Sequence, residues 1–240
     1  MIKGVIFDVD NTLLDFARMK KIALSESVDA MIDAGLEMSH KKAFKMIHEI
    51  LDKNGLEMHT LFQKFSRKVY GKINARIVGA AIITHRKVWS GFLHTYPGVV
   101  RTLLELKGKG LKLCIVSDAN KIHVFERLYA SRIVDFFDCV VCHDDTHKFK
   151  PARRPFVHAL RKVKLKAEEC VMVGDWIKGD VLGAQKMGMK GCLAKYGQMS
   201  NYSRSISNSE HLKKFKEIKP DYVLKKFSDI LKVVDRESKS

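Results

Sequence analysis

Acidic residues follow directly on two short apolar runs of this 240-residue chain. Asp8 and Asp10 follow the run GVIF near the N-terminus, and Asp175 and Asp180 follow the run ECVMVG. A bare carboxylate is costly inside a hydrophobic core, so these positions predict strand ends that are open to a ligand. Acids gathered at one edge raise one another's pKa values, and a hard divalent cation relieves their repulsion. The acids therefore predict a site for Mg²⁺.

A hydroxyl and an ammonium group follow two other apolar runs. Ser117 and Asp118 come after LKLCIV, and Lys150 precedes Pro151 in the loop after DCVVCH. Each residue alone has a structural explanation, as a helix N-cap or a surface lysine. Beside a bound divalent cation, however, a hydroxyl and an ammonium suit an anion. A phosphoryl group is the natural candidate for that anion.

The elements that must position these residues are short apolar runs rich in β-branched side chains. The first four runs are mostly continuous rather than alternating, which is typical of strands buried on both faces of a parallel sheet. Helical spacing of apolar residues separates the later runs, so the pattern predicts an α/β layered fold. The carboxyl ends of such strands share one edge, where ligands bind. The predicted strands are Gly4–Asp8, Leu111–Ser117, Asp138–His143 and Glu169–Asp175, with weaker ones at Lys190–Lys195 and Asp221–Lys226.

Residues 16–95 interrupt this alternation with helical patterns that stop near Gly35 and Gly55. Their apolar positions predict a separate helix bundle inserted after the first strand. The turn signal YPG marks the return to the sheet. We therefore expect one domain from residues 1–15 and 96–240, and a second domain from residues 16–95. A polar, serine-rich stretch at 197–219 is expected to be a loop.

Composition excludes several other classes of protein. The net charge is +17, but the basic residues are spread evenly, so a solvated lysine-rich surface is expected rather than a nucleic-acid-binding arm. No apolar run approaches the roughly 18 residues of a membrane span, and there is no secretory signal. These features predict a cytoplasmic protein without a membrane partner, as a monomer or homodimer.

The five cysteines lie in or beside apolar runs, as reduced and buried cysteines do. One alternative is a zinc site formed by Cys139, Cys142, His143 and His147. The geometry disfavours it, because Cys139 and Cys142 point to opposite faces of an extended strand.

Four segments resemble, in order and spacing, the four motifs of the haloacid dehalogenase superfamily. The resemblance covers nearly the whole chain and implies a Rossmann-like parallel sheet flanked by helices, with an inserted all-helical cap domain of the C1 type. YPGV and PDYVLKKFSDIL also resemble stretches of its phosphatase branch. The four segments are FDVDNTL (7–13), IVSDAN (115–120), KP (150–151) and VGDWIKGDVLGAQKMGM (173–189).

The resemblance implies distinct roles for the four acids. Asp8 would be the nucleophile that forms an aspartyl-phosphate. Asp10 would be the general acid for the leaving alkoxide and then the base that activates water. Mg²⁺ would bind Asp8, the backbone carbonyl of Asp10, and Asp175. Asp180 would ligate the metal or support one of its ligands.

The resemblance also implies a set of phosphate-binding groups. Ser117 would hydrogen-bond the phosphoryl oxygens, together with backbone N–H groups near Asn11 and Asp118. Lys150 would offset the charge of the nucleophile and of the transferring group. One departure is the ARR sequence after KP, where the family often has an acidic or neutral residue. Arg153 and Arg154 either add positive potential near the site or face solvent.

The second acid distinguishes between reactions within the superfamily. A halide leaves unprotonated, whereas an alkoxide needs a proton, so Asp10 favours phosphate ester hydrolysis over dehalogenation. We therefore expect a Mg²⁺-dependent phosphatase acting on a small phosphomonoester, such as a sugar phosphate, a nucleotide or a related metabolite. The alternatives are a phosphomutase with the same intermediate, a haloacid dehalogenase, and a non-catalytic basic nucleic-acid-binding protein. Candidates for specificity in the cap are His59, Tyr70, His85 and Trp89.

Overall fold

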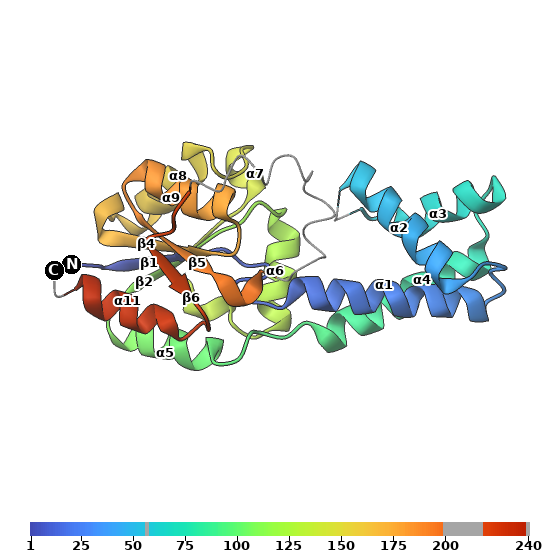
Figure 1. The fold of residues 1–240 in the computed structure, drawn as a ribbon, viewed down its shortest axis with the longest axis horizontal. Helices are drawn as coiled ribbons and strands as arrows, with labels where there is room; N and C mark the ends of the chain where they lie inside the picture. Colours follow the sequence, from blue (N-terminus) through green and yellow to red (C-terminus); the bar gives the residue numbers. More distant parts are fainter. Residues whose placement is uncertain (56–57, 199–217, 239–240) are drawn as a thin grey trace. The chain divides into compact units, whose positions relative to one another are not determined.

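A computed structural model describes residues 1–55, 58–198 and 218–238 of the protein (Figure 1). Six strands of the described chain form one sheet in the order β3-β2-β1-β4-β5-β6. Every neighbouring pair is parallel, which confirms the predicted α/β fold. Each strand falls within one of the six predicted apolar runs. The strands are β1 (Gly4–Phe7), β2 (Lys112–Val116), β3 (Cys139–Val141), β4 (Cys170–Gly174), β5 (Lys190–Ala194) and β6 (Tyr222–Leu224).

Strand β1 lies at the centre of the sheet and sets the level of the site. All four of its residues are buried, as expected for a strand covered on both faces. Phe7 pairs in register with Ile115 of β2 and Val173 of β4. Because β1, β2 and β4 end at the same level, the residues that follow them are delivered to one edge.

Helices cover both faces of this sheet. In Figure 1, α8 and α9 lie on one face, and α5 and α11 lie on the other. A π-helical turn, Ile177–Val181, directly precedes α9. The described helices outside residues 16–92 are α5 (Val99–Gly108), α6 (Lys121–Ala130), α7 (His143–Thr146), α8 (Arg153–Val163), α9 (Leu182–Met187) and α11 (Asp229–Glu237). Short 3₁₀ turns occur at Val134–Phe136, Ala167–Glu169 and Lys195–Gly197.

The described chain forms two compact units. One contains Met1–Phe16 and the described residues from Leu93 onward, and the other is Ala17–Phe92. The second unit contains no strand among its described residues. Whether it acts as a cap stays a prediction, and most of the serine-rich stretch 197–219 lies outside the described residues.

The helical unit packs through apolar faces on successive helices. Gly55 directly follows α2 and Gly71 directly follows α3, and their positive φ angles of 90° and 71° favour glycine. No helix in the described chain is long and apolar enough to span a membrane. The helices are α1 (Phe16–Asp33), α2 (His40–Asn54), α3 (Leu61–Tyr70) and α4 (Ala75–Phe92).

All five cysteines are free and buried. Cys139 and Cys142 belong to no cluster of metal-ligating side chains among the described residues, where the one such cluster is acidic. Nothing in the described chain therefore favours the zinc alternative.

Replacing Phe156 with alanine should strongly destabilise the α/β unit. Phe156 is fully buried in the cluster between α8 and the sheet. We expect a loss of about 3–5 kcal/mol in the free energy of unfolding, measured by urea denaturation. Tyr129→Ala, at a position that is 66% exposed, is the control and should cost far less. Equal losses for the two variants would contradict this packing.

Candidate active site

Three carboxylates meet at the carboxyl edge of the sheet. Asp8 follows β1, Asp175 follows β4, and Asp180 lies in the π-helical turn after β4. One carboxylate oxygen of each lies within 4.8 Å of the other two. Asp8 and Asp180 are buried, and Asp175 is partly exposed. Three carboxylates this close together could hold a hard divalent cation, which prefers oxygen ligands.

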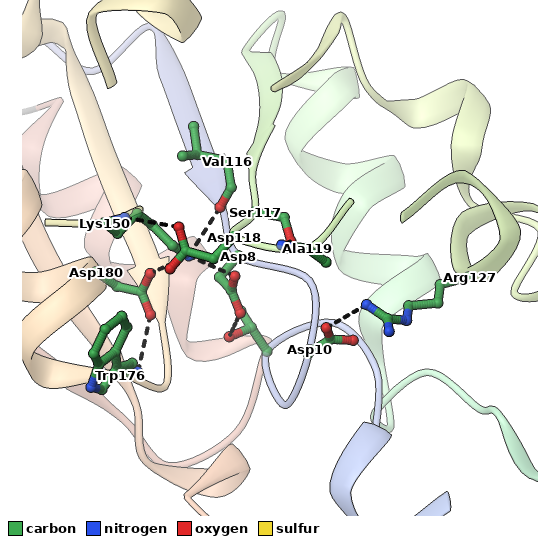
Figure 2. Close-up of polar contacts among 11 residues, drawn as sticks. Asp8, Asp10, Val116, Ser117, Asp118, Ala119, Arg127, Lys150, Trp176 and Asp180 are labelled. Carbon is green, nitrogen blue, oxygen red and sulfur yellow. Dashed lines mark hydrogen bonds and ion pairs between the residues drawn. The ribbon is translucent and has the colours of Figure 1, made fainter. Parts of the chain in front are cut away.

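Lys150 is the buried cation of this cluster. Its Nζ lies 2.7 Å from Asp8 Oδ1 and 2.6 Å from Asp180 Oδ1, and it donates a hydrogen bond of 3.1 Å to the carbonyl of Val116 (Figure 2). The loop after β3 therefore inserts an ammonium between the residues after β1 and β4. One lysine offsets only part of the charge of three acids.

The electrostatics of the cluster follow from its burial. Removal from water raises the pKa of Asp180 to about 7, and the neighbouring Asp8 adds to this effect while Lys150 opposes it. The pKa of Asp175 is raised well above its usual value by burial and by the charges of Asp8 and Asp180. Burial alone would lower the pKa of Lys150, but the charges of Asp180 and Asp8 hold it well above its usual value. The lysine thus stays charged, and the acids favour either protons or a cation.

Close backbone packing fixes the position of Asp180. Its Oδ2 accepts a hydrogen bond of 3.0 Å from the backbone N–H of Trp176. A Cβ atom on Gly174 would lie 2.2 Å from the Asp180 carboxylate, and one on Gly179 would lie 2.0 Å from the Trp176 ring. A larger residue at Gly174 would displace the Asp180 carboxylate, and one at Gly179 would displace the Trp176 ring.

The structure places Ser117 and Asp118 on the other side of β1, after β2. Ser117 is buried, and its Oγ accepts a hydrogen bond of 3.2 Å from the backbone N–H of Ala119. Asp118 Oδ1 accepts a hydrogen bond of 2.8 Å from the backbone N–H of Lys150. Burial raises the pKa of Asp118, although Lys150 opposes the shift. Asp118 thus connects the loop after β2 to the lysine.

Asp10 has a different partner from the acidic cluster. Its Oδ2 lies 2.6 Å from Nη1 of Arg127, a buried residue of α6 (Figure 2). Sequence reasoning missed Arg127. The available signal was its position beside Val124 and Leu128, on the buried face of an amphipathic helix, where a charged residue is unusual.

The loop between Asp8 and Asp15 is held from several directions. Asn11 has a left-handed φ of 57°, and its N–H donates to the Leu14 carbonyl at 2.8 Å. Thr12 Oγ1 donates a hydrogen bond of 3.4 Å to Asp8 Oδ2. These contacts make a tight turn directly after the first acid.

A turn after β5 also supports this loop, and sequence reasoning missed it. The Tyr196 hydroxyl donates a hydrogen bond of 2.8 Å to the Thr12 carbonyl, and Gln198 Nε2 donates one of 3.0 Å to the Asp175 carbonyl. A Cβ atom on Gly197 would lie 1.5 Å from the Asn11 carbonyl oxygen, so only glycine fits there. The turn thus contacts the backbone on both sides of the acidic cluster.

The remaining candidates from the sequence lie outside this arrangement. Arg153 and Arg154 are exposed at the start of α8, as the solvent-facing alternative expected. In the helical unit, burial lowers the pKa of His85, whose ring centroid lies 5.7 Å from that of Phe62. His59 and Tyr70 are exposed.

A family model described as haloacid dehalogenase-like hydrolase matches residues 5–194. The chain belongs to this family. It is 36% identical to the glyceraldehyde 3-phosphate phosphatase of Methanocaldococcus jannaschii over 79% of this chain and 83% of that protein. It is 30% identical to the enzyme of the same name from Pyrococcus furiosus, over 100% of this chain and 95% of that one.

Solved structures show the same fold at lower sequence identity. A HAD phosphatase from Thermococcus onnurineus gives a TM-score of 0.67 at 22% identity, over 97% of this chain and 98% of that chain. The family and its curated relatives confirm the expected assignment to the phosphatase branch of the haloacid dehalogenase superfamily. The protein is therefore a phosphoric monoester hydrolase of the haloacid dehalogenase type.

Replacing Gly174 with alanine should displace Asp180 from the cluster. The new methyl group overlaps the Asp180 carboxylate, so we expect a loss of about 1–3 kcal/mol in the free energy of unfolding together with reduced activity. Gly108→Ala is the matched control, because a Cβ atom there meets nothing within 4 Å. This control should leave stability unchanged or raise it by up to about 1 kcal/mol. A Gly174→Ala variant as stable and active as the control would contradict the packing described for Asp180.

Proposed function

We propose that the protein is a Mg²⁺-dependent phosphatase that hydrolyses a small phosphomonoester through an aspartyl-phosphate on Asp8. One observation supports this proposal above all: the Asp8 carboxylate lies 2.7 Å from the Lys150 ammonium, in a cluster that also contains Asp175 and Asp180. A nucleophile needs this neighbouring positive charge to approach an anionic phosphoryl group.

The residues present fit a magnesium ion. Mg²⁺ prefers carboxylate oxygens from one or two residues, completed by water and phosphate oxygens. Asp8 and Asp175 would hold it, with the backbone carbonyl of Asp10, and Asp180 would support the site from its position beside Lys150. When bound, the ion would neutralise charge on the transferring phosphoryl group.

The chain's own residues divide the reaction into two steps. In the first, Asp8 attacks phosphorus, the ester P–O bond breaks, and Asp10 gives a proton to the leaving oxygen. In the second, Asp10 takes a proton from water, water oxygen bonds to phosphorus, and the bond between Asp8 and phosphorus breaks. Ser117 and the backbone N–H groups near Asn11 and Asp118 would bind the phosphoryl oxygens. Lys150 would offset their charge throughout.

The relatives suggest the class of substrate. The relatives from Methanocaldococcus jannaschii and Pyrococcus furiosus described above are called glyceraldehyde 3-phosphate phosphatase. A pyrophosphatase called PpaX from Bacillus mycoides is 28% identical over 98% of both chains. We therefore propose a phosphorylated three-carbon sugar as the first substrate to test, with pyrophosphate as the comparison.

Asp8→Asn should abolish catalysis without unfolding the protein. The amide cannot form the aspartyl-phosphate, so kcat for release of phosphate from glyceraldehyde 3-phosphate should fall by about 10⁴-fold or more. EDTA should stop the wild-type reaction, and added Mg²⁺ should restore it. The matched control is Asp235→Asn, which removes a half-exposed carboxylate paired with Lys109 and should leave kcat unchanged.

The outcomes of this assay separate the alternatives. Activity that survives Asp8→Asn or EDTA would rule out the proposed chemistry. Transfer of phosphate to another position of the sugar, with no release of phosphate, would indicate a phosphomutase instead.

Binding of Mg²⁺ should weaken as the pH falls. The raised pKa values of Asp175 and Asp180, the latter at about 7, mean that protons compete with the metal at acidic pH. A Mg²⁺ concentration 100 times its dissociation constant at pH 8 should raise Tm by about 5–10 °C at pH 8. The same Mg²⁺ concentration should raise Tm by less at pH 6. NaCl at equal ionic strength is the control. An equal rise at both pH values would contradict the role of these acids as ligands.

Without metal, the contribution of these acids to the stability of the fold should decrease as the pH rises. A carboxyl group whose pKa is raised by folding binds more protons in the folded state than in the unfolded state. Stability is then lost as the pH rises from about 4, the unfolded value, toward the folded value. In EDTA-treated protein, these acids should therefore lower Tm progressively as the pH rises across this range. Added Mg²⁺ should offset that loss at high pH.

A further inference from the structure

Arg127 is a buried cation that lies away from the strand ends. It belongs to α6, its side chain is only 4% exposed, and Nη1 contacts Asp10 Oδ2 at 2.6 Å. Figure 2 shows its guanidinium directed at the Asp10 carboxylate, while Lys150 and Asp180 lie on the other side of Asp8. The two acids of the first motif therefore have different cationic partners.

The same guanidinium also contacts the far end of the loop after β1. Its Cζ lies 4.2 Å from the centroid of the Phe16 ring, a cation–π distance. Phe16 is 9% exposed and is the first residue of α1. Arg127 thus holds the loop at Asp10 and at Phe16, so the guanidinium restricts both the direction of the carboxylate and the path of the backbone beyond it.

Stability alone is a weak reason for such a pair. Removing two charged groups from water is costly, and well-packed apolar residues in place of both partners are often as stable as the ion pair or more so. A guanidinium is planar and holds its N–H groups in fixed directions, so even a single contact such as Nη1–Oδ2 orients a carboxylate better than a lysine, whose ammonium is a mobile point charge. The residue type matches a need to orient Asp10.

We propose that Arg127 is a positioning residue for proton transfer by Asp10. It holds the carboxylate so that the proton moves from Asp10 to the leaving-group oxygen as the P–O bond breaks, and it stabilises the negative charge that Asp10 then acquires. In the second step the same orientation lets Asp10 accept a proton from water. This inference rests on the proposed function, because it assigns a role within that reaction.

The effect of replacing Arg127 should depend on whether the leaving group needs a proton. An alkoxide needs a proton as it departs, whereas p-nitrophenolate is stable without one. Arg127→Met should therefore reduce kcat for an alkyl phosphate, such as glyceraldehyde 3-phosphate, by about 100-fold, the lower end of what general acid catalysis contributes. The fall in kcat for p-nitrophenyl phosphate should be at least 10-fold smaller. Arg127→Lys, which keeps the charge but loses the planar guanidinium, should give an intermediate loss.

The controls separate positioning from folding. Arg101→Met removes an arginine of α5 whose side chain is 87% exposed, and it should leave both rates unchanged. Asp10→Asn and the double variant Asp10→Asn, Arg127→Met should show equal rates on the alkyl phosphate, because Arg127 acts only through Asp10. If Arg127→Met does not fold, Arg127→Lys and the double variant, which leaves no uncompensated charge, carry the test.

Two outcomes would overturn the inference. One is an equal loss of kcat on both substrates, and the other is a double variant that is much slower than Asp10→Asn alone. Both leave the proposed function intact, since the wild-type protein still hydrolyses the two esters. A wild-type protein that hydrolyses neither ester would instead count against the proposed function itself.

Discussion

The structure depends on the burial of negative charge at one edge of a parallel sheet. Asp8, Asp175 and Asp180 have carboxylate oxygens within 4.8 Å of one another, and in the described part of the chain the ammonium of Lys150 is the one paired with two of them. The raised pKa values of Asp175 and Asp180 are the direct consequence. The repulsion that makes the cluster costly to fold also favours the binding of a cation, which is the basis of the metal site proposed here.

The parts of the cluster come from three connections of the sheet: Asp8 follows β1, Lys150 lies in the loop after β3, and Asp175 and Asp180 follow β4. β1 lies between β2 and β4, so its terminal acid is flanked by the residues that follow both neighbours. The loop after β3 reaches across β2 to supply Lys150, whose backbone N–H is held by Asp118. Glycines then allow the closest approaches: Gly174 beside the Asp180 carboxylate, and Gly197 beside the Asn11 carbonyl. A larger residue at either position would move a side chain or a carbonyl of the site.

The sequence predicted the residues at the strand ends but not the contacts made by Tyr196 and Arg127, and both results have a physical explanation. Continuous apolar runs identify buried parallel strands, and the carboxyl ends of such strands must share an edge, so the meeting of Asp8, Asp175 and Lys150 was predictable. The contact of Tyr196 with Thr12 was not, because it joins residues 184 positions apart through a turn that has no pattern of its own. Arg127 was missed for another reason: helical periodicity treats a charged residue as solvent-facing, and its burial depends on a partner in a distant loop.

The two acids after β1 show how one short stretch can support two kinds of chemistry. Asp8 and Asp10 are two residues apart, yet Asp8 meets an ammonium and other carboxylates, whereas Asp10 meets a guanidinium and keeps 24% of its side chain exposed. A carboxylate that attacks phosphorus needs positive charge nearby to offset the negative charge of the phosphoryl group. The Lys150 ammonium lies beside Asp8 and can supply that charge. A group that exchanges protons with a leaving oxygen and then with water needs orientation together with access. The contact with the Arg127 guanidinium and the partial exposure of Asp10 match those two needs, so the different cations beside the two carboxylates support the different roles proposed for them.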